Sequence, residues 1–182
     1  MELDIETNRK TTNYSKIILF KRIMWSVASM FFRYSPRTAF AYRIYILRMF
    51  GAKIGKQVHV YSTARIAFPW NLEVDDWSAL GENTLIYSVG KIVIGKKVTI
   101  SQNAHLCAAT HDFTNISLPI VTQQITIHDQ VWVAADAFIA PGIIIGEGAI
   151  IGARSAVFKN VEPWAIVGGN PAKFIKKRII KN

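Results

Sequence analysis

The sequence predicts an all-β protein whose main body is a parallel β-helix, and three observations carry this prediction. From residue 54 onward, isoleucine, leucine or valine recurs every six residues in three blocks, at fifteen positions in all. Four residues after each, nine of the fifteen positions hold alanine, serine, threonine or glycine. Insertions fall only between groups of three hexads. Hexapeptide repeats of this kind form parallel β-helices, whereas an antiparallel sandwich would alternate with a period of two.

The composition fits one globular domain with a short additional segment. Of the 182 residues, 51% are hydrophobic and 19% are charged, which excludes a disordered chain. The single cysteine, Cys107, excludes an intramolecular disulfide framework and indicates a reducing compartment, so we expect a cytoplasmic protein. The net charge of +10 predicts an anionic partner.

Residues 1–53 form a basic, aromatic segment that is expected to be helical. They hold ten basic and three acidic residues, so most of the net charge lies here. The apolar pattern predicts a helix over about 15–33, a break at Ser35–Pro36, and a second helix over about 38–50 that ends at Gly51.

The same segment has features that bear on whether the protein spans or contacts a membrane. Its longest uninterrupted apolar stretch, 23–32, has ten residues and is too short to span a bilayer. Basic residues beside aromatic ones suit helices that lie in an anionic lipid interface, so residues 15–50 are expected to make peripheral contact with the cytoplasmic membrane face. The alternative is that these helices pack on the protein or on a neighbouring subunit. Nucleic acid is not the expected partner, because the charge lies at the two ends of the chain.

Residues 54–162 are expected to form five coils of 18 residues each. Each hexad makes one short strand and one corner, and the coils stack about 4.8 Å apart. A loop at 112–126 interrupts the stack, and residues 163–182 are expected to form a basic tail or a short helix. The coils are predicted at 54–71, 74–91, 94–111, 127–144 and 145–162.

Three segments resemble a known enzyme family: SQNAHLCAATHDF (101–113), ITIHDQVWVAADAFIAPGIIIGEGAIIGARSAVFKNV (125–161) and GGNPAKFIKKR (168–178). They resemble the hexapeptide-repeat acyltransferases, whose fold is a left-handed parallel β-helix, and in particular the sugar O-acetyltransferases of colanic-acid and other exopolysaccharide biosynthesis. The resemblance implies a homotrimer with sites between subunits, in which acetyl-CoA acetylates a saccharide hydroxyl and no metal is required.

His111 is the candidate general base among four histidines. It is the last residue of the third predicted coil and directly precedes the long loop, and loops that the repeat does not need are often functional. It also matches the family's catalytic histidine in the ATHDF segment. Histidine suits this role because it gains and loses a proton near neutral pH. The neighbouring Asp112 is a candidate to orient His111.

The resemblance also implies residues for acetyl-CoA. It places the backbone of Ala135 and Ala153 on acetyl-CoA, and their separation of 18 residues stacks them one coil apart. Phe158 and Lys159 match positions that contact the coenzyme further along. Lys173 and Lys176 match basic positions for its phosphates, although lysine lacks the bidentate geometry of arginine.

The acceptor side departs from the galactoside acetyltransferases, because their acidic acceptor ligand falls near Val89, where no carboxylate stands. Asn83, Tyr87, Ser88 and Asp112 are the candidate acceptor residues, and a lipid-linked or nucleotide sugar is the alternative acceptor.

Three other functions stay open on the sequence. A sugar N-acetyltransferase would use the same repeat, and a non-enzymatic β-helix scaffold would not bind CoA. A metal hydratase of the γ-carbonic anhydrase type binds zinc through histidines of two subunits, two of them spaced H-x4-H. Here His105 and His111 are spaced H-x5-H.

Overall fold

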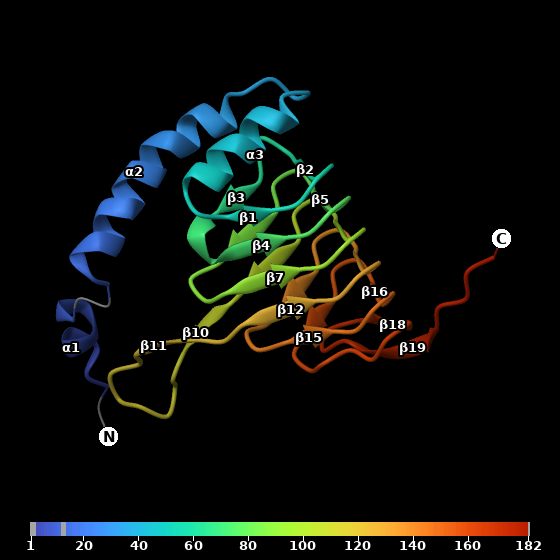
Figure 1. Ribbon diagram of the computed structural model, residues 1–182. Helices are drawn as coiled ribbons and strands as arrows, with labels where there is room; N and C mark the ends of the chain where they lie inside the picture. Colours follow the sequence, from blue (N-terminus) through green and yellow to red (C-terminus); the bar gives the residue numbers. More distant parts are fainter. Residues whose placement is uncertain (1–2, 12–13, 182) are drawn as a thin grey trace.

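The protein is a three-sided prism of short strands, with two helices over one end and a short helix beside a projecting hairpin (Figure 1). The computed structural model describes residues 3–11 and 14–181. The helices are α1 (Ile5–Lys10), α2 (Lys16–Arg33) and α3 (Phe40–Met49). The predicted helices over 15–33 and 38–50 are confirmed as α2 and α3, whereas α1 was not predicted.

We name the three sides of the prism the A, B and C faces, in the order in which the chain visits them. The A face contains β1 (Lys53–Ile54), β4 (Leu72–Val74), β7 (Ile92–Ile94), β12 (Ile125–Ile127) and β15 (Ile144–Ile145). The B face contains β2 (His59–Val60), β5 (Ala79–Leu80), β8 (Thr99–Ile100), β13 (Trp132–Val133), β16 (Ile150–Ile151), β18 (Ala165–Gly168) and β19 (Lys173–Lys177). The C face contains β3 (Arg65–Ile66), β6 (Leu85–Tyr87), β9 (His105–Cys107), β14 (Phe138–Ile139) and β17 (Ala156–Val157), and the short 3-10 helix η1 (Pro69–Asn71) precedes β4.

The strand register confirms the predicted repeat and the parallel β-helix class, and the architecture agrees with the left-handed form that the resemblance implies. Neighbouring coils pair in parallel, so that Ile94 lies beside Ile127 and Ile127 beside Ile145. The repeated aliphatic side chains therefore stack into one continuous core inside the prism. All fifteen are buried: Ile54, Val60, Ile66, Val74, Leu80, Ile86, Ile94, Ile100, Leu106, Ile127, Val133, Ile139, Ile145, Ile151 and Val157.

The nine small residues that stand four positions after a repeated aliphatic residue are predicted to face inward, and all but one of them do. Eight of the nine are buried, but Thr110 is exposed. The third coil does not continue to His111, because the chain leaves the prism at Ala109 and begins β10 (Ala109–His111). The prediction of an inward Thr110 was therefore wrong.

Glycine is required at the turns from the A face to the B face, where successive coils come very close. A Cβ on Gly95 would lie 2.9 Å from the backbone nitrogen of Asp129 in the next coil. The carboxylate of Asp129 accepts a hydrogen bond from the backbone of Lys96 at 2.8 Å, which ties the two coils together. Glycine is needed here for close approach of the backbone, whereas Lys97, two positions on, has the positive φ of 56°.

Helices α2 and α3 close the first coil. The indole nitrogen of Trp25 donates to the carbonyl of Ile66 at 2.7 Å and anchors α2, and Leu47 of α3 is fully buried over the open end. Arg43 of α3 is also fully buried and donates to backbone carbonyls around it. These contacts shield the apolar interior of the first coil from water.

The last coil is closed by a strand pair, not by a helix. β19 runs antiparallel to β18, and the Arg178 guanidinium after it donates to the carbonyls of Gln130 and Gly148 at 3.0 and 2.9 Å. Residues 163–182 were expected to form a short helix or a tail, but β18 continues the B face beside β16, and the backbone groups at its free edge are satisfied by β19.

Candidate active site

Between the third and fourth coils the chain leaves the prism as an antiparallel hairpin, formed by β10 and β11 (Ile120–Thr122) (Figure 1). In its register His111 lies opposite Ile120. The excursion begins at Ala109, and the chain has rejoined the A face by Ile125, so it is shifted relative to the predicted loop at 112–126. His111 therefore lies on a projecting arm and not at a corner of the coil.

The tip of the hairpin is organised by its own polar side chains. One oxygen of the Asp112 carboxylate accepts hydrogen bonds from the backbone nitrogen of Thr114 at 3.0 Å and from its hydroxyl at 2.6 Å. These bonds favour the ionised carboxylate and lower the pKa of Asp112. The side chain of Asn115 bonds Ser117 in the same way. Asp112 thus shapes the turn, and the expectation that it orients His111 was wrong.

The His111 imidazole is exposed and is oriented by a backbone carbonyl. Its Nδ1 atom lies 2.6 Å from the carbonyl oxygen of Leu118. A carbonyl oxygen can only accept, so Nδ1 carries the hydrogen and donates it, which leaves the lone pair of the neutral ring on Nε2. This is the tautomer in which Nε2 can take a proton from a substrate.

The other three histidines lie elsewhere. The ring of His59 stacks on Phe40 with centroids 4.4 Å apart, and His128 is exposed at the edge between the A and B faces. His105 packs edge-on against Phe138, and burial lowers its pKa. Its Nε2 is buried and finds no hydrogen-bond partner within the described ranges. In the part of the chain that the structure describes, no three His, Cys, Asp or Glu side chains gather as metal ligands.

Ala135 and Ala153 lie in successive turns at the edge between the B and C faces. The backbone nitrogen of Arg154 donates to the carbonyl of Ala135 at 2.8 Å, so these turns stack one coil apart, as their spacing predicts. Within residues 3–11 and 14–181, the amides of Ala135 and Ala153 have no hydrogen-bond acceptor. Ala153 is exposed and Ala135 is half-buried, so the two amides are available to a ligand at this edge.

The other predicted coenzyme residues are exposed but spread out. Phe158 and Lys159 follow β17, where the chain turns from the C face to the A face, and the Phe158 ring lies 5.9 Å from that of Phe138. Lys173 and Lys176 lie on β19 at the end of the prism, beside β18.

The hairpin and the alanine turns lie on different edges of one prism. The hairpin leaves where the C face passes into the A face, whereas Ala135 and Ala153 lie between the B and C faces. Within one chain, therefore, the width of the C face separates the imidazole from the two free amides.

The three acceptor candidates outside the hairpin lie in different places on the prism. Tyr87 lies on β6 beside Cys107, close to the base of the hairpin, and burial raises the pKa of its hydroxyl. Asn83 lies at the edge between the B and C faces, two coils before Ala135 in the stack. Ser88 is fully buried, and its hydroxyl bonds the backbone nitrogen and oxygen of Phe68 at 3.0 Å each. The expectation that Ser88 contacts an acceptor was wrong, because its hydrogen bonds lie inside the fold.

Two residues near His111 escaped the sequence analysis. Leu118 acts through its backbone carbonyl, which its side chain does not reveal. Asn8 of α1 donates from its side-chain nitrogen to the carbonyls of Ser117 and Leu118 at 2.5 and 2.6 Å. Nothing in the repeat indicates a contact between residues so far apart in the chain.

Comparisons with known proteins agree with this architecture. Residues 124–159 match the family model described as bacterial transferase hexapeptide (six repeats). Over 158 residues, and 87% of each chain, the sequence is 38% identical to the putative colanic acid biosynthesis acetyltransferase WcaF of Escherichia coli (strain K12). The crystal structure of a maltose O-acetyltransferase from Clostridium difficile 630 superposes with a TM-score of 0.81 at 27% identity, covering 91% of this chain and 90% of that one. A hexapeptide-repeat acetyltransferase from Vibrio cholerae, solved with acetyl coenzyme A, shares the fold with a TM-score of 0.84 at 22% identity and 93% coverage of both chains.

Proposed function

The chain belongs to the bacterial hexapeptide-repeat transferase family and is an acyltransferase, and from this premise we propose that it moves the acetyl group of acetyl-CoA to a saccharide hydroxyl. The observation that carries the proposal is the His111 imidazole, exposed on the hairpin with its Nδ1 held by the Leu118 carbonyl. The relative named for colanic acid biosynthesis makes an exopolysaccharide precursor the first acceptor class to test.

In the proposed reaction, Nε2 of His111 takes the hydroxyl proton while the hydroxyl oxygen attacks the thioester carbonyl. The oxygen of the tetrahedral intermediate is stabilised by backbone N–H groups, a role for which the amides of Ala135 and Ala153 are candidates. When the C–S bond breaks, the imidazolium returns the proton to the departing thiolate. The Leu118 carbonyl stabilises the imidazolium, because the ring's Nδ1–H points at its negative end.

The test of this proposal is acceptor-dependent release of CoA. Three classes of acceptor are tested: free sugars, nucleotide sugars and lipid-linked saccharides. We expect the protein to release the thiol of CoA from acetyl-CoA when an acceptor of one of these classes is present. Hydroxylamine removes an acetyl ester and leaves an acetamide, so it separates O-acetylation from the N-acetyl alternative. Failure to bind CoA, together with no release of its thiol in the presence of any saccharide or amino sugar, would favour a scaffold. We place the reaction in the cytoplasm, where acetyl-CoA is available.

We propose that the active site forms between the subunits of a trimer. The hairpin and the alanine turns lie on different edges of the prism, so a closed ring of three chains can bring the His111 edge of one chain against the Ala153 edge of the next. Lys159, Lys173 and Lys176 are exposed and can then reach the phosphates of the coenzyme as point charges.

Mixed trimers test this arrangement. His111→Ala removes the base, and Ala153→Trp blocks the coenzyme at an exposed turn that tolerates a large side chain; each variant alone is expected to be inactive. Random co-assembly in equal amounts should restore about a quarter of wild-type activity, because that fraction of interfaces joins an intact His111 to an intact Ala153. No recovery from co-assembled trimers would contradict a site shared between chains.

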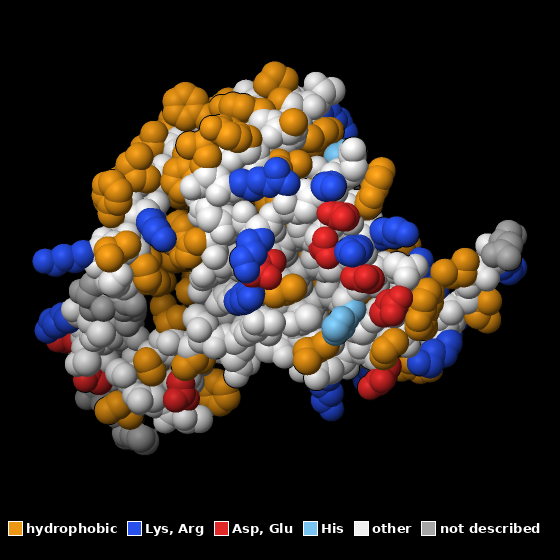
Figure 2. All heavy atoms as spheres, viewed as in Figure 1, with side chains coloured by type: hydrophobic (Ala, Val, Ile, Leu, Met, Phe, Trp, Pro, Cys, Tyr) orange, Lys and Arg blue, Asp and Glu red, His pale blue; other side chains and the backbone are white. Residues whose placement is uncertain are grey.

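We also propose that residues 15–50 contact an anionic membrane. The face of α2 opposite Trp25 and Phe32 is apolar and exposed along its whole length, and Figure 2 shows hydrophobic side chains gathered over α2 and α3. Lys21 and Arg22 lie over the rings of Trp70 and Tyr14, on the side of α2 nearer the prism, and among the described residues they pair with no carboxylate. No helix of the described chain is both long and apolar enough to cross a bilayer, so the contact would lie in the interface. The exposed apolar side chains are Ile17, Leu19, Phe20, Ile23, Met24, Val27, Met30 and Phe31, joined by Tyr42, Tyr45 and Met49 of α3.

Polar substitutions on α2 should abolish vesicle binding. The triple variant Phe20→Ser, Val27→Ser and Phe31→Ser is expected to lower partitioning onto phosphatidylglycerol vesicles at least about tenfold, since each substitution removes apolar area from the interface. The matched control replaces three exposed apolar residues at the other end of the molecule: Phe174→Ser, Ile179→Ser and Ile180→Ser. Equal sedimentation of both variants with vesicles would reject the membrane contact, and loss of the trimer only in the α2 variant would assign this face to a subunit interface.

A further inference from the structure

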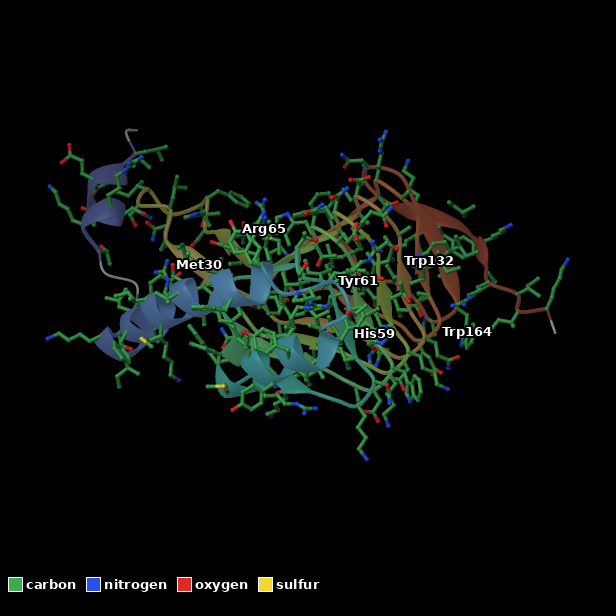
Figure 3. The ribbon with its side chains drawn as sticks, turned by 90° about the horizontal axis from the view of Figure 1, so that it is seen from above. Met30, His59, Tyr61, Arg65, Trp132 and Trp164 are labelled. Carbon is green, nitrogen blue, oxygen red and sulfur yellow. The ribbon has the colours of Figure 1, made fainter. Side chains whose placement is uncertain are left out.

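Helix α1 lies directly against the hairpin that carries His111, and both views show the two side by side (Figures 1 and 3). The backbone nitrogen of Asp4, the N-cap of α1, donates to the carbonyl of Ile116 at 2.9 Å. The side-chain nitrogen of Asn8, half-buried in this contact, donates to the carbonyls of Ser117 at 2.5 Å and Leu118 at 2.6 Å.

The Leu118 carbonyl is therefore shared between Asn8 and His111. It accepts one hydrogen bond from the Asn8 amide and one from Nδ1 of His111, both at 2.6 Å, which uses its two lone pairs. Leu118 has a φ of +45°, a conformation that a residue with a side chain keeps only where its surroundings hold it. Asn8 is one of the groups that hold it.

The tip of the hairpin has few other supports. Its remaining hydrogen bonds are internal, through Asp112 and Asn115, and Phe113 is 85% exposed. Among the described residues, every hydrogen bond that reaches residues 112–119 from outside the hairpin comes from Asp4 or Asn8. The position of the tip relative to the prism thus depends on α1.

We propose that Asn8 is a positioning residue for His111, acting through the Leu118 carbonyl. By fixing that carbonyl, Asn8 keeps the proton of the neutral imidazole on Nδ1 and the lone pair on Nε2. Without it, the Leu118 carbonyl is free to turn away, and the ring then adopts a mixture of tautomers and orientations. The inference rests on the proposed role of His111 as the base, but the state of the ring can be measured without any acceptor.

The kinetic test compares substitutions on one helix. Asn8→Ala removes the donor, and Asn8→Asp keeps the shape while replacing the donor by an acceptor. Both are expected to lower kcat about tenfold, with the KM for acetyl-CoA unchanged, because the Asn8 side chain bonds only the Ser117 and Leu118 carbonyls and none of the proposed coenzyme residues. The control is Glu6→Gln, since Glu6 is exposed and pairs only with Lys10 of its own helix in the described structure. Wild-type kcat in Asn8→Ala would overturn the proposal.

The spectroscopic test uses 15N chemical shifts of the imidazole, with the His111 signals assigned by their loss in His111→Ala. In the wild-type protein we expect Nδ1 to be protonated and Nε2 to be bare. In Asn8→Ala the Nε2-protonated form should become a major species, while circular dichroism and the thermal midpoint of the prism stay near wild type. An unchanged tautomer would overturn the proposal even if activity fell. A shifted tautomer in a protein that acetylates no saccharide would uphold the proposal while refuting the proposed function.

Discussion

Replacing His111 by alanine is expected to lower kcat for acetyl transfer by about 10²- to 10⁴-fold, the usual contribution of a positioned acid–base group. The loss falls on kcat because the imidazole takes the proton only as the hydroxyl attacks the thioester. Affinity for acetyl-CoA should stay within about twofold, since the proposed contacts with the coenzyme are made by the Ala135 and Ala153 amides and by lysines, not by the imidazole. The measurements are initial rates of CoA release and calorimetric titration with CoA.

His128→Ala is the matched control for this variant. His128 is an exposed histidine at the edge between the A and B faces, remote from the hairpin, so its loss should leave the rate unchanged. Turnover by His111→Ala equal to that of His128→Ala would remove His111 from the mechanism. It would leave the membership of the family intact, because the prism does not depend on this side chain.

Replacing Arg43 by methionine is expected to destabilise the fold by about 3–5 kcal/mol. The Arg43 side chain is fully buried under α3. Its guanidinium donates to the carbonyls of Val60, Pro36 and Arg37 at 2.6 to 2.7 Å, and to the Ser35 hydroxyl at 2.9 Å. Methionine has a similar length but no donor, so the carbonyls would stay buried without partners. Burial also lowers the pKa of the guanidinium, but its carbonyl partners make the charge tolerable.

The control for stability is Arg65→Met, because Arg65 points outward from β3 and is exposed. Its substitution should change the free energy of unfolding by no more than about 0.5 kcal/mol. Both variants are compared with the wild type by urea unfolding at one chain concentration, since assembly into the proposed trimer would couple association to folding. A midpoint for Arg43→Met equal to that of Arg65→Met would show that the buried guanidinium contributes little to the closure of the prism.

The expectations that failed share a physical cause. Ser88 was chosen for its place in the stretch that corresponds to the acceptor ligand of the galactoside acetyltransferases, and Asp112 as the neighbour of His111. In both cases backbone groups take up the hydrogen-bonding capacity of the hydroxyl or the carboxylate. Thr110 stands at a position that the six-residue repeat predicts to face inward, but the chain has already left the prism at Ala109. The six-residue pattern in the sequence does not show at which residue the chain leaves the prism.

The sequence by itself determined the stacked coils, the buried aliphatic column and the two helices α2 and α3, because each arises from a short, repeated spacing of apolar residues. It also singled out His111, through a motif of neighbouring residues. Only the tertiary structure decided that His111 lies on an arm, that a leucine carbonyl orients its ring, and that Asn8 holds that carbonyl from more than a hundred residues away. Backbone groups carry no signature in the sequence, and contacts between distant segments exist only once the chain has folded.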